Sequence, residues 1–430
     1  MLTRLSLAVA ASCAFTNAAS CQTDRTTWLR SNALALADNS SDADLARISR
    51  ALQGVDVVFL GESSHGDGGA HLARVRLVRY LHERLGFDVI AWEAGTREAA
   101  TFDSLLGTSA ALGSISATAL YPWWAPSAEL RPMLEYVRST RRSSRPLTFA
   151  GFDIQRSGPI EALVADLRRG FAQSGNAELF PKALDDSLSI YLRRLDGSTG
   201  ASRDSVEEKI ERVIHAATPE LRRRFESARG AFERRVGARP TAFLNRVLFN
   251  LSSNAEQLAA SGVASYNIRE QRNAENIVWL LRERYPGRKL IVWSHNVHAI
   301  NTRFTQRFDG VAATAAENTR DATARIVHDS LGTRAYSVIV ASYDGAWAFP
   351  NGQRTELPPA APGSFVDLMH GTGMATAFLD LRGTLPAWLN EPLVGTLNTQ
   401  SPARYPIVWP RATDGILFID RMTPSSVAPD

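Results

Sequence analysis

The sequence predicts an α/β fold: a mostly parallel central sheet flanked by helices, with a large helical insertion that forms a side domain over a cleft. Two observations support this prediction. Four short apolar runs have the length of a strand, and they show no apolar–polar alternation. Such runs are typical of strands buried on both faces, as in a parallel sheet covered by helices. Between residues 158 and 261, in contrast, only helical spacing occurs.

The length and charge of the chain limit its organisation. A chain of 430 residues can hold two or three average domains, or one large α/β domain with an insertion. We expect the second arrangement, with a core in two parts, 22–157 and 262–425, around the helical insertion at 158–261. The core is expected to begin with a short linker and an amphipathic helix in 22–54. The net charge of +4 is small for this length, so nucleic acid is not a predicted partner, and the oligomeric state stays open.

Residues 1–20 have the pattern of a secretory signal peptide. A short basic segment, Met1 to Arg4, precedes an apolar segment from Leu5 to Phe15 that is too short to span a membrane. The two cysteines of the chain are Cys13, inside this segment, and Cys21, directly after it. Two interpretations are open: a lipid anchor at Cys21, as in a bacterial lipoprotein, or ordinary cleavage. Both predict an exported protein, periplasmic or membrane-anchored, without an intramolecular disulfide bond.

The first apolar run, from Val55 to Leu60, ends in a glycine turn that carries Glu62 and His65. In open α/β sheets, ligands bind just beyond the carboxyl ends of the strands. The run therefore places these two side chains where such a fold has its chemistry. A helix is predicted to follow over residues 70–85, and Arg74 lies on its apolar stripe.

The second and third runs end in the same way. Residues 87–92 lead into Glu93, and residues 146–152 lead into Asp153. Between the two runs we predict, in order, a helix near 96–106, a loop to about residue 119, the pair Trp123 and Trp124, and a helix that ends near residue 142. The two tryptophans are interpreted as packing residues or as a wall for a substrate.

The fourth run, residues 289–294, leads into His295 and His298. A helix is predicted before it over residues 265–284, and it carries Arg269 and Glu270. Glu270 lies on the apolar stripe of that helix, and a carboxylate that points into a core must be paired or functional. Further strands are predicted at 335–341, 375–381 and 415–419.

Several kinds of catalytic site are absent from the sequence. It contains no GxSxG elbow, no Walker A motif, no GxGxxG motif after the first strand and no HExxH motif. The cysteine count rules out a catalytic thiol. If the four strands are parallel neighbours, their ends bring together a cluster of acidic and basic side chains: Glu62, His65, Glu93, His295 and His298, with Arg74, Asp153 and Glu270 as neighbours.

The residue types in this cluster suit hydrolysis. A carboxylate beside a histidine raises the basicity of the imidazole and fixes its tautomer. Such an imidazole can take a proton from water near neutral pH, which is general-base hydrolysis without a covalent intermediate. Histidine and carboxylate side chains also suit zinc, so a metal-dependent hydrolase is an open alternative. The other five histidines are expected to be structural: His71, His82, His215, His328 and His370.

The order and spacing of these residues resemble a known family. Gly61-Glu62-Ser63-Ser64-His65-Gly66, then Arg74 and Glu93, then Trp293-Ser294-His295-Asn296-Val297-His298 resemble the erythromycin esterase family, also labelled succinoglycan-biosynthesis-like. The resemblance covers nearly all of the chain after the signal peptide. It implies an α/β core with a helical side domain and a deep cleft at the strand ends. One departure is the turn Asp67-Gly68-Gly69-Ala70, where relatives tend to carry a Thr-x-Glu-aromatic pattern, so this wall of the cleft is expected to differ.

The resemblance implies a function and a division of roles. The protein is expected to hydrolyse a carboxylic ester or macrolactone, with His65 as the general base and Glu62 and Glu93 orienting it or the water. Arg74, His295 or His298 is expected to stabilise the oxyanion, and no metal or other cofactor is implied. The residues expected to bind the substrate are Trp123, Trp124, Asp153, Arg269 and Glu270. A second alternative is a non-catalytic binding protein related to the cell envelope or its polysaccharides.

Overall fold

The structure is a computed structural model that describes residues 22–36, 42–195, 202–305, 319–400 and 404–428. The expected signal peptide and Cys21 lie outside the described residues. Within the described part of the chain, no helix is both long and apolar enough to cross a membrane.

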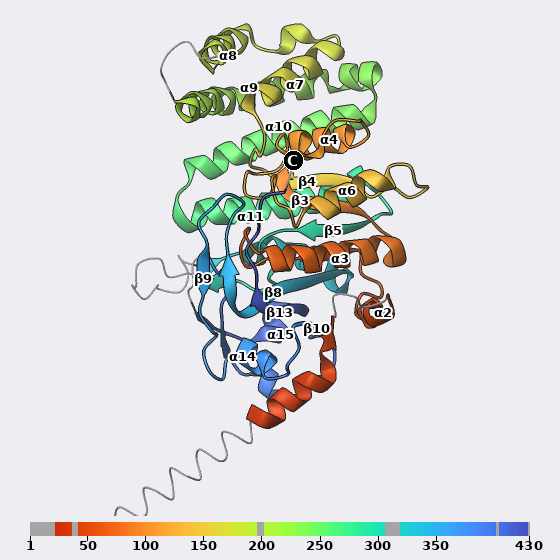
Figure 1. Cartoon of the computed structure of the whole chain (residues 1–430). Helices are drawn as coiled ribbons and strands as arrows, with labels where there is room; N and C mark the ends of the chain where they lie inside the picture. The colour runs from red at the N-terminus through yellow and green to blue at the C-terminus, as the bar shows by residue number, and fades with distance from the viewer. Residues whose placement is uncertain (1–21, 37–41, 196–201, 306–318, 401–403, 429–430) are drawn as a thin grey trace, which may run out of the picture.

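A nine-stranded sheet forms the centre of the molecule, in the order β1-β10-β13-β8-β2-β5-β3-β4, with β9 paired to β8. The four predicted strands are adjacent and parallel: β2 (Val57–Leu60), β5 (Lys289–Trp293), β3 (Phe87–Gly95) and β4 (Thr148–Asp153). Their carboxyl ends therefore meet at one edge of the sheet, as the sequence predicted (Figure 1).

The other half of the sheet is mixed. β8 (Ala335–Trp347) pairs in parallel with β2 and with β13 (Gly415–Met422). β10 (Thr376–Asp380) is antiparallel to β13 and to β1 (Leu34–Ala35), and β9 (Thr355–Leu357) is antiparallel to β8. Two small ribbons lie apart from the sheet: β11 (Leu393–Gly395) with β12 (Tyr405–Ile407), and β6 (Phe304–Thr305) with β7 (Thr319–Arg320).

Both faces of the sheet are covered, which explains the unbroken apolar runs. In β2, Val58 and Leu60 pack into one core, while Val57 and Phe59 pack into a second core on the opposite face. The first core includes side chains of α2 (Asp42–Ala51), α3 (Gly68–Leu85), α4 (Thr96–Leu105) and α6 (Arg131–Thr140). The second includes side chains of α11 (Gly262–Trp279), α13 (Thr323–Leu331), α14 (Phe365–His370) and α15 (Trp409–Ala412).

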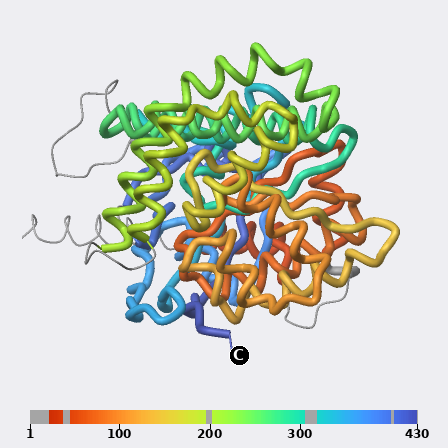
Figure 2. Tube along the Cα trace, turned by 90° about the horizontal axis from the view of Figure 1, so that it is seen from above, coloured from red at the N-terminus to blue at the C-terminus, as the bar shows by residue number. Residues whose placement is uncertain are grey.

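The stretch between the third and fourth runs is helical and has its own core. It consists of α7 (Ile160–Gln173), α8 (Lys182–Leu195), α9 (Arg203–Val236) and α10 (Ala238–Ala259). Its core holds side chains of all four helices, including Leu167, Leu188, Phe225 and Leu248. Figure 1 shows these helices, coloured yellow to green, at one end of the molecule, and Figure 2 views the molecule from that end.

Two local predictions were wrong. The predicted linker contains a helix over residues 22–32, because Leu29 and Ala33 pack into the second core, where Leu29 is fully buried. The predicted loop before residue 119 contains the short helix α5 (Leu112–Ser116), whose Leu112 and Ile115 pack into the first core. In both segments packing against the core outweighs a weak local signal.

Candidate active site

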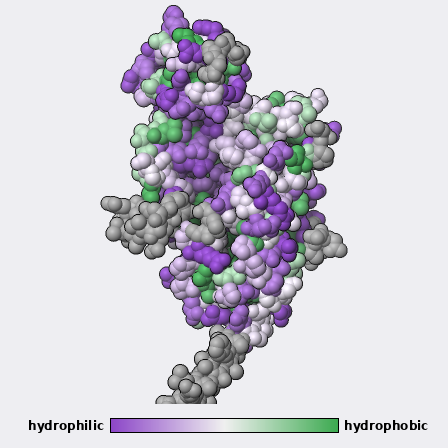
Figure 3. Space-filling model, turned by 60° about the vertical axis from the view of Figure 1, so that its left-hand side comes forward, coloured by the Kyte–Doolittle hydropathy of each residue, from purple (hydrophilic) through white to green (hydrophobic). Residues whose placement is uncertain are grey.

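The ends of β2, β3, β4 and β5 bring the predicted cluster together. Glu62 and His65 lie in the turn after β2, Glu93 lies near the end of β3, and Asp153 is the last residue of β4. His295 is the N-cap residue of α12 (Asn296–Ala299), directly after β5, and His298 lies within α12. Figure 3 shows the helical insertion set off from the sheet domain, with hydrophilic residues gathered in the hollow between them.

The centre of the cluster is a pair formed by His65 and Glu62. His65 Nδ1 donates to Glu62 Oε1 at 2.6 Å, and no described residue hydrogen-bonds to His65 Nε2. The Glu62 side chain is fully buried, whereas 17% of the His65 side chain is exposed. Burial raises the pKa of Glu62, but Arg74 and the hydrogen bond from His65 outweigh burial and lower it to about 2. Glu62 is therefore an anion that keeps the proton on Nδ1, and Nε2 has no hydrogen-bond partner among the described residues.

Arg74 lies beneath Glu62 and is fully buried. Its Nη2 forms an ion pair with Glu62 Oε2, and its Nη1 donates to the carbonyl of Leu60 at 3.2 Å. The guanidinium carbon also lies 3.6 Å from the ring centroid of Trp293. Arg74 was expected as one candidate to stabilise the oxyanion; in the structure it is the counter-ion of Glu62, and both terminal nitrogens of its guanidinium contact groups of the protein.

Aromatic side chains surround His65. The Trp123 ring stacks on the His65 ring with centroids 5.5 Å apart, and Trp124 meets it edge-on at 4.6 Å. Trp124 is buried, and its Nε1 donates to Glu62 Oε1 at 3.1 Å. Tyr121 stacks on the outer side of Trp123 at 4.6 Å. The two tryptophans thus restrict the orientation of the His65–Glu62 pair, and only Trp123 is partly exposed.

His295 is neutral and fixed by its neighbours. Its Nε2 donates to the carbonyl of Ser63 at 3.0 Å, and its Nδ1 accepts from the backbone of Val297 at 3.2 Å. Its backbone N–H donates to Glu93 Oε2 at 2.9 Å. Burial, reinforced by the nearby His65 and His298, lowers the pKa of His295 to about 3. With both ring nitrogens engaged, His295 holds the turn that carries His65 and has no N–H for an oxyanion.

His298 is a buried cation. Its Nδ1 lies 2.6 Å from Glu270 Oε1, and its Nε2 lies 3.2 Å from Glu93 Oε1. Burial lowers its pKa, but the two carboxylates outweigh burial and raise it to about 10. Glu270 also accepts from the backbone of Thr323 at 2.9 Å and from its hydroxyl at 2.8 Å. Glu270, the carboxylate that was expected to be paired or functional, is therefore paired.

Arg269 connects the remaining carboxylates. Its Nε donates to Asp153 Oδ1 at 3.1 Å, and its Nη2 donates to Asp153 Oδ2 at 2.5 Å and to Glu93 Oε1 at 3.0 Å. Asp153 and Glu270, which were expected to bind the substrate, have fully buried side chains and act as counter-ions. Glu93 was expected to orient His65 or the water; its carboxylate accepts from Arg269 and from the backbone of His295, and it lies 3.2 Å from His298 Nε2. Arg269 keeps 15% of its side chain exposed.

This arrangement does not fit a metal ion. Within the described part of the chain, no three His, Cys, Asp or Glu side chains lie as a group that could hold one. The nitrogens of His295 are bound to a carbonyl and an N–H, and those of His298 lie against two carboxylates. Among the ring nitrogens of these three described histidines, Nε2 of His65 alone has no protein partner, and the nearby carboxylates are paired with arginine or histidine side chains.

The comparisons with known proteins agree with this architecture. The family model described as erythromycin esterase matches residues 82–422. The chain belongs to the erythromycin esterase family. The matched segment includes Glu93, Asp153, His295 and His298, and it begins after the turn that carries Glu62 and His65.

Three relatives found by the comparisons have low sequence identity to this chain. A Bacillus subtilis protein, YbfO, named as a presumed hydrolase, is 24% identical over 93% of this chain and 91% of its own length. Erythromycin esterase type II of Escherichia coli is 23% identical over 76% of this chain and 80% of its length. The crystal structure of a mutant erythromycin esterase in its open conformation has a TM-score of 0.64 at 17% identity, over 91% of this chain and 96% of that one. This likeness supports the same α/β fold.

Two residues near the pair were not among the predicted site residues. His71 was expected to be structural; it is buried, accepts from Arg74 Nη2 at 2.9 Å and donates to the carbonyl of His65 at 3.1 Å. Asp67 accepts from the hydroxyl of Ser63 at 2.6 Å and from the backbone of Ser64 at 2.7 Å. An Asp directly before a helix is a capping signal, and it marks Asp67 in the sequence without revealing that the side chain turns back into the site.

Asp67 makes a pH-dependent contribution to stability. Burial raises its pKa to about 7 from an ordinary value of 3.8. The folded state therefore holds this proton more tightly than the unfolded state, and the stabilisation is complete below about pH 4 and is lost as the pH rises through 7. We expect Asp67→Asn to flatten this decline and to be more stable than the wild type at pH 8. Urea unfolding at pH 5 and pH 8 measures the free energy of unfolding, and Asp329→Asn, at an exposed position, is the control. If the stability of Asp67→Asn falls between pH 5 and pH 8 as much as that of the wild type, Asp67 is not the group responsible.

Proposed function

We propose that this protein hydrolyses a carboxylic ester or macrolactone by general-base catalysis at His65. The observation that carries the proposal is the His65–Glu62 pair: a carboxylate holds Nδ1 at 2.6 Å, the side chain is 17% exposed, and Nε2 has no hydrogen-bond partner among the described residues. The same carboxylate–imidazole arrangement turns histidine into a proton acceptor in other hydrolases. Membership of the erythromycin esterase family supports an ester as the bond that is broken.

The reaction follows from these positions. His65 Nε2 takes a proton from a water molecule, and the oxygen of that water attacks the carbonyl carbon of the ester. The carbonyl oxygen becomes an oxyanion, the bond to the alcohol oxygen then breaks, and His65 returns the proton to the leaving alcohol. The products are one carboxylic acid and one alcohol, which are parts of a single chain when the substrate is a lactone.

In this proposal, Arg269 supplies the positive charge that stabilises the oxyanion. Arg269 uses Nε and Nη2 for Asp153 and Glu93, while Nη1 lies 3.4 Å from His298 Nε2 and contacts no carboxylate of the described residues. Burial lowers the pKa of Arg269, but Asp153 and Glu93 outweigh burial and raise it well above its usual value, so the guanidinium stays charged. A fixed cation of this kind stabilises a developing oxyanion more strongly than bulk water does.

The test of this proposal is turnover of a substrate panel. Macrolides, aryl and alkyl esters, amides and phosphoesters are incubated with the purified protein, with and without EDTA. Ester hydrolysis that EDTA does not affect is the expected result. Activity that EDTA removes and zinc or manganese restores would replace the proposal with a metal-dependent hydrolase. Tight binding of a panel compound without turnover would replace it with a binding protein.

Glu62→Gln tests the tautomer argument. An amide can donate to Nδ1, which places the imidazole proton on Nε2 and removes the base. We expect kcat to fall by roughly 10²-fold, with little change in KM, because Glu62 contacts His65 and not the substrate. Steady-state kinetics measure the effect, and Glu98→Gln, a buried carboxylate of α4 outside the His65 pair, is the control. An unchanged kcat in Glu62→Gln would contradict the tautomer argument.

A further inference from the structure

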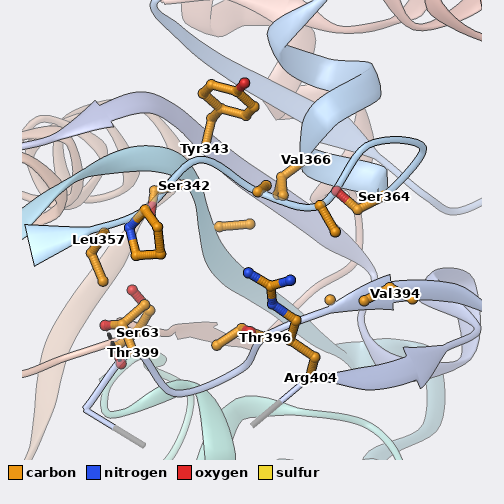
Figure 4. Close-up of a pocket in the computed structure, with 15 residues that line it drawn as sticks. Ser63, Ser342, Tyr343, Leu357, Ser364, Val366, Val394, Thr396, Thr399 and Arg404 are labelled. Atoms are coloured by element: carbon orange, nitrogen blue, oxygen red, sulfur yellow. Dashed lines mark hydrogen bonds between the residues drawn. The ribbon is translucent and has the colours of Figure 1, made fainter. Parts of the chain in front are cut away.

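A cavity lies beside the catalytic turn, against the middle of β8 at Ala341, Ser342 and Tyr343. It has a volume of about 400 Å³, within the usual range of small-molecule sites. Figure 4 shows its walls, which come from β8, the segment after β9, the start of α14 and the ribbon of β11 and β12. The apolar part of the wall consists of Leu357, Pro358, Val366 and Val394. Val394 is 42% exposed, an uncovered apolar side chain at the rim.

One peptide group separates this cavity from the catalytic cluster. Ser63 lines the cavity, and its carbonyl accepts from His295 Nε2 on the cluster side. Thr399, which also lines the cavity, donates to the same carbonyl through its backbone N–H at 2.9 Å and its hydroxyl at 3.2 Å. The cavity is thus adjacent to the catalytic turn, and the ring of His65 does not belong to its wall.

The charge in this cavity is unbalanced. Among the 15 lining residues Arg404 is the only charged one, so no carboxylate faces it from the wall. The guanidinium of Arg404 is turned into the space bounded by Ser342, Leu357 and Val366 (Figure 4). Arginine offers a planar fork of N–H donors that matches a carboxylate in two parallel hydrogen bonds. Arg404 is exposed and has no carboxylate among the lining residues, whereas Arg269 in the catalytic cluster is paired with Asp153.

We propose that this cavity binds a small organic carboxylate. Its anionic group pairs with Arg404, and its apolar body lies against Leu357, Pro358, Val366 and Val394. The hydroxyls of Ser342 and Ser364 lie on the same wall and add polar contacts beside the cation. The proposal concerns a second ligand site and does not depend on the reaction catalysed at His65.

Isothermal titration calorimetry with hexanoate and benzoate tests the proposal. Hexanamide and benzamide, which have the same shape without the charge, are the matched ligands. We expect the carboxylates to bind about ten- to a hundredfold more tightly than the amides, because a charge-assisted pair with Arg404 is lost in the amides. Equal affinity for acids and amides, or no binding of any of the four, would overturn the proposal.

Variants of the protein test whether the carboxylate binds in this cavity. Arg404→Gln is expected to weaken carboxylate binding by at least about tenfold, and Val394→Glu, at an exposed position, to weaken it through repulsion of like charges. Arg239→Gln, an exposed arginine of α10, is the control and should bind as the wild type does. Carboxylate binding that survives Arg404→Gln would place the ligand elsewhere. Binding that disappears in His65→Asn would place it in the catalytic cleft, and either result overturns the proposal.

Discussion

Replacing His65 with asparagine is expected to lower kcat by about 10²–10⁴-fold, the contribution of a positioned general base. Asparagine is smaller than histidine, so the ring contacts with Trp123 and Trp124 are lost, but 17% of the side chain is already exposed and the fold should tolerate the change. The pair has no second base to replace it, because both nitrogens of His295 are bound and His298 is a cation. Steady-state kinetics with the ester that the wild type hydrolyses fastest measure the loss in kcat.

A matched control for His65 exists in the same chain. His370 also holds a carboxylate at Nδ1, Asp420, at the same distance of 2.6 Å, and its ring stacks on Tyr343 at 3.8 Å. It lies in α14, outside the cluster at the strand ends. His370→Asn should leave kcat unchanged. If both variants lose activity equally, a carboxylate–histidine pair is not by itself the feature that matters; if neither does, His65 is not the base.

The strands and the edge that carries the site could be predicted from the sequence. An apolar run without alternation requires burial on both faces, and β2 has this burial, with Val57 and Val58 in opposite cores. Once four such runs lie parallel, their ends must coincide, so the grouping of Glu62, Glu93, Asp153 and His295 follows from topology. This part of the prediction depended only on local pattern and strand direction.

The roles within the cluster could not be predicted, because they depend on contacts between distant segments. The helical stripe identified Arg74 as a buried cation, but the sequence does not say whether its partner is Glu62 or Glu93. Trp124 reaches Glu62 across 62 residues, and Arg269 reaches Asp153 across 116. The carboxylate with which each cation pairs determines which histidine is neutral, and these pairings are set only when the chain is folded.

The pairings divide the cluster into two charge systems. Glu62 with Arg74 is one, and it leaves a single proton position, Nε2 of His65, open to a substrate. Glu93, Asp153 and Glu270 with Arg269 and His298 form the other, in which three anions face two cations. In the proposed reaction, the first system supplies the base, and Arg269 of the second supplies a fixed guanidinium for the oxyanion.

Replacing Arg74 with methionine is expected to cost about 3–5 kcal/mol in the free energy of unfolding, the range found when one partner of a buried ion pair is removed. Methionine fills much of the same volume, so the loss comes from the charge and not from a cavity. Glu62, fully buried, would be left with His65, His71 and Trp124 as neighbours, and its pKa would rise because burial is no longer opposed by the guanidinium. Turnover should fall as well, since a protonated Glu62 no longer stabilises the charged form of His65.

The double variant Arg74→Met/Glu62→Gln separates the stability of the pair from its catalytic role. With both charges removed, no uncompensated ion remains in the core, so we expect the double variant to be more stable than Arg74→Met alone and still inactive. Arg229→Met, which removes a surface pair with Glu233, should change the free energy of unfolding by at most about 1 kcal/mol. Urea unfolding of the wild type, Arg74→Met, Glu62→Gln and the double variant measures the coupling. A double variant no more stable than Arg74→Met would mean that Arg74 stabilises the core through Trp293 and Leu60, and that Glu62 owes its negative charge to other neighbours.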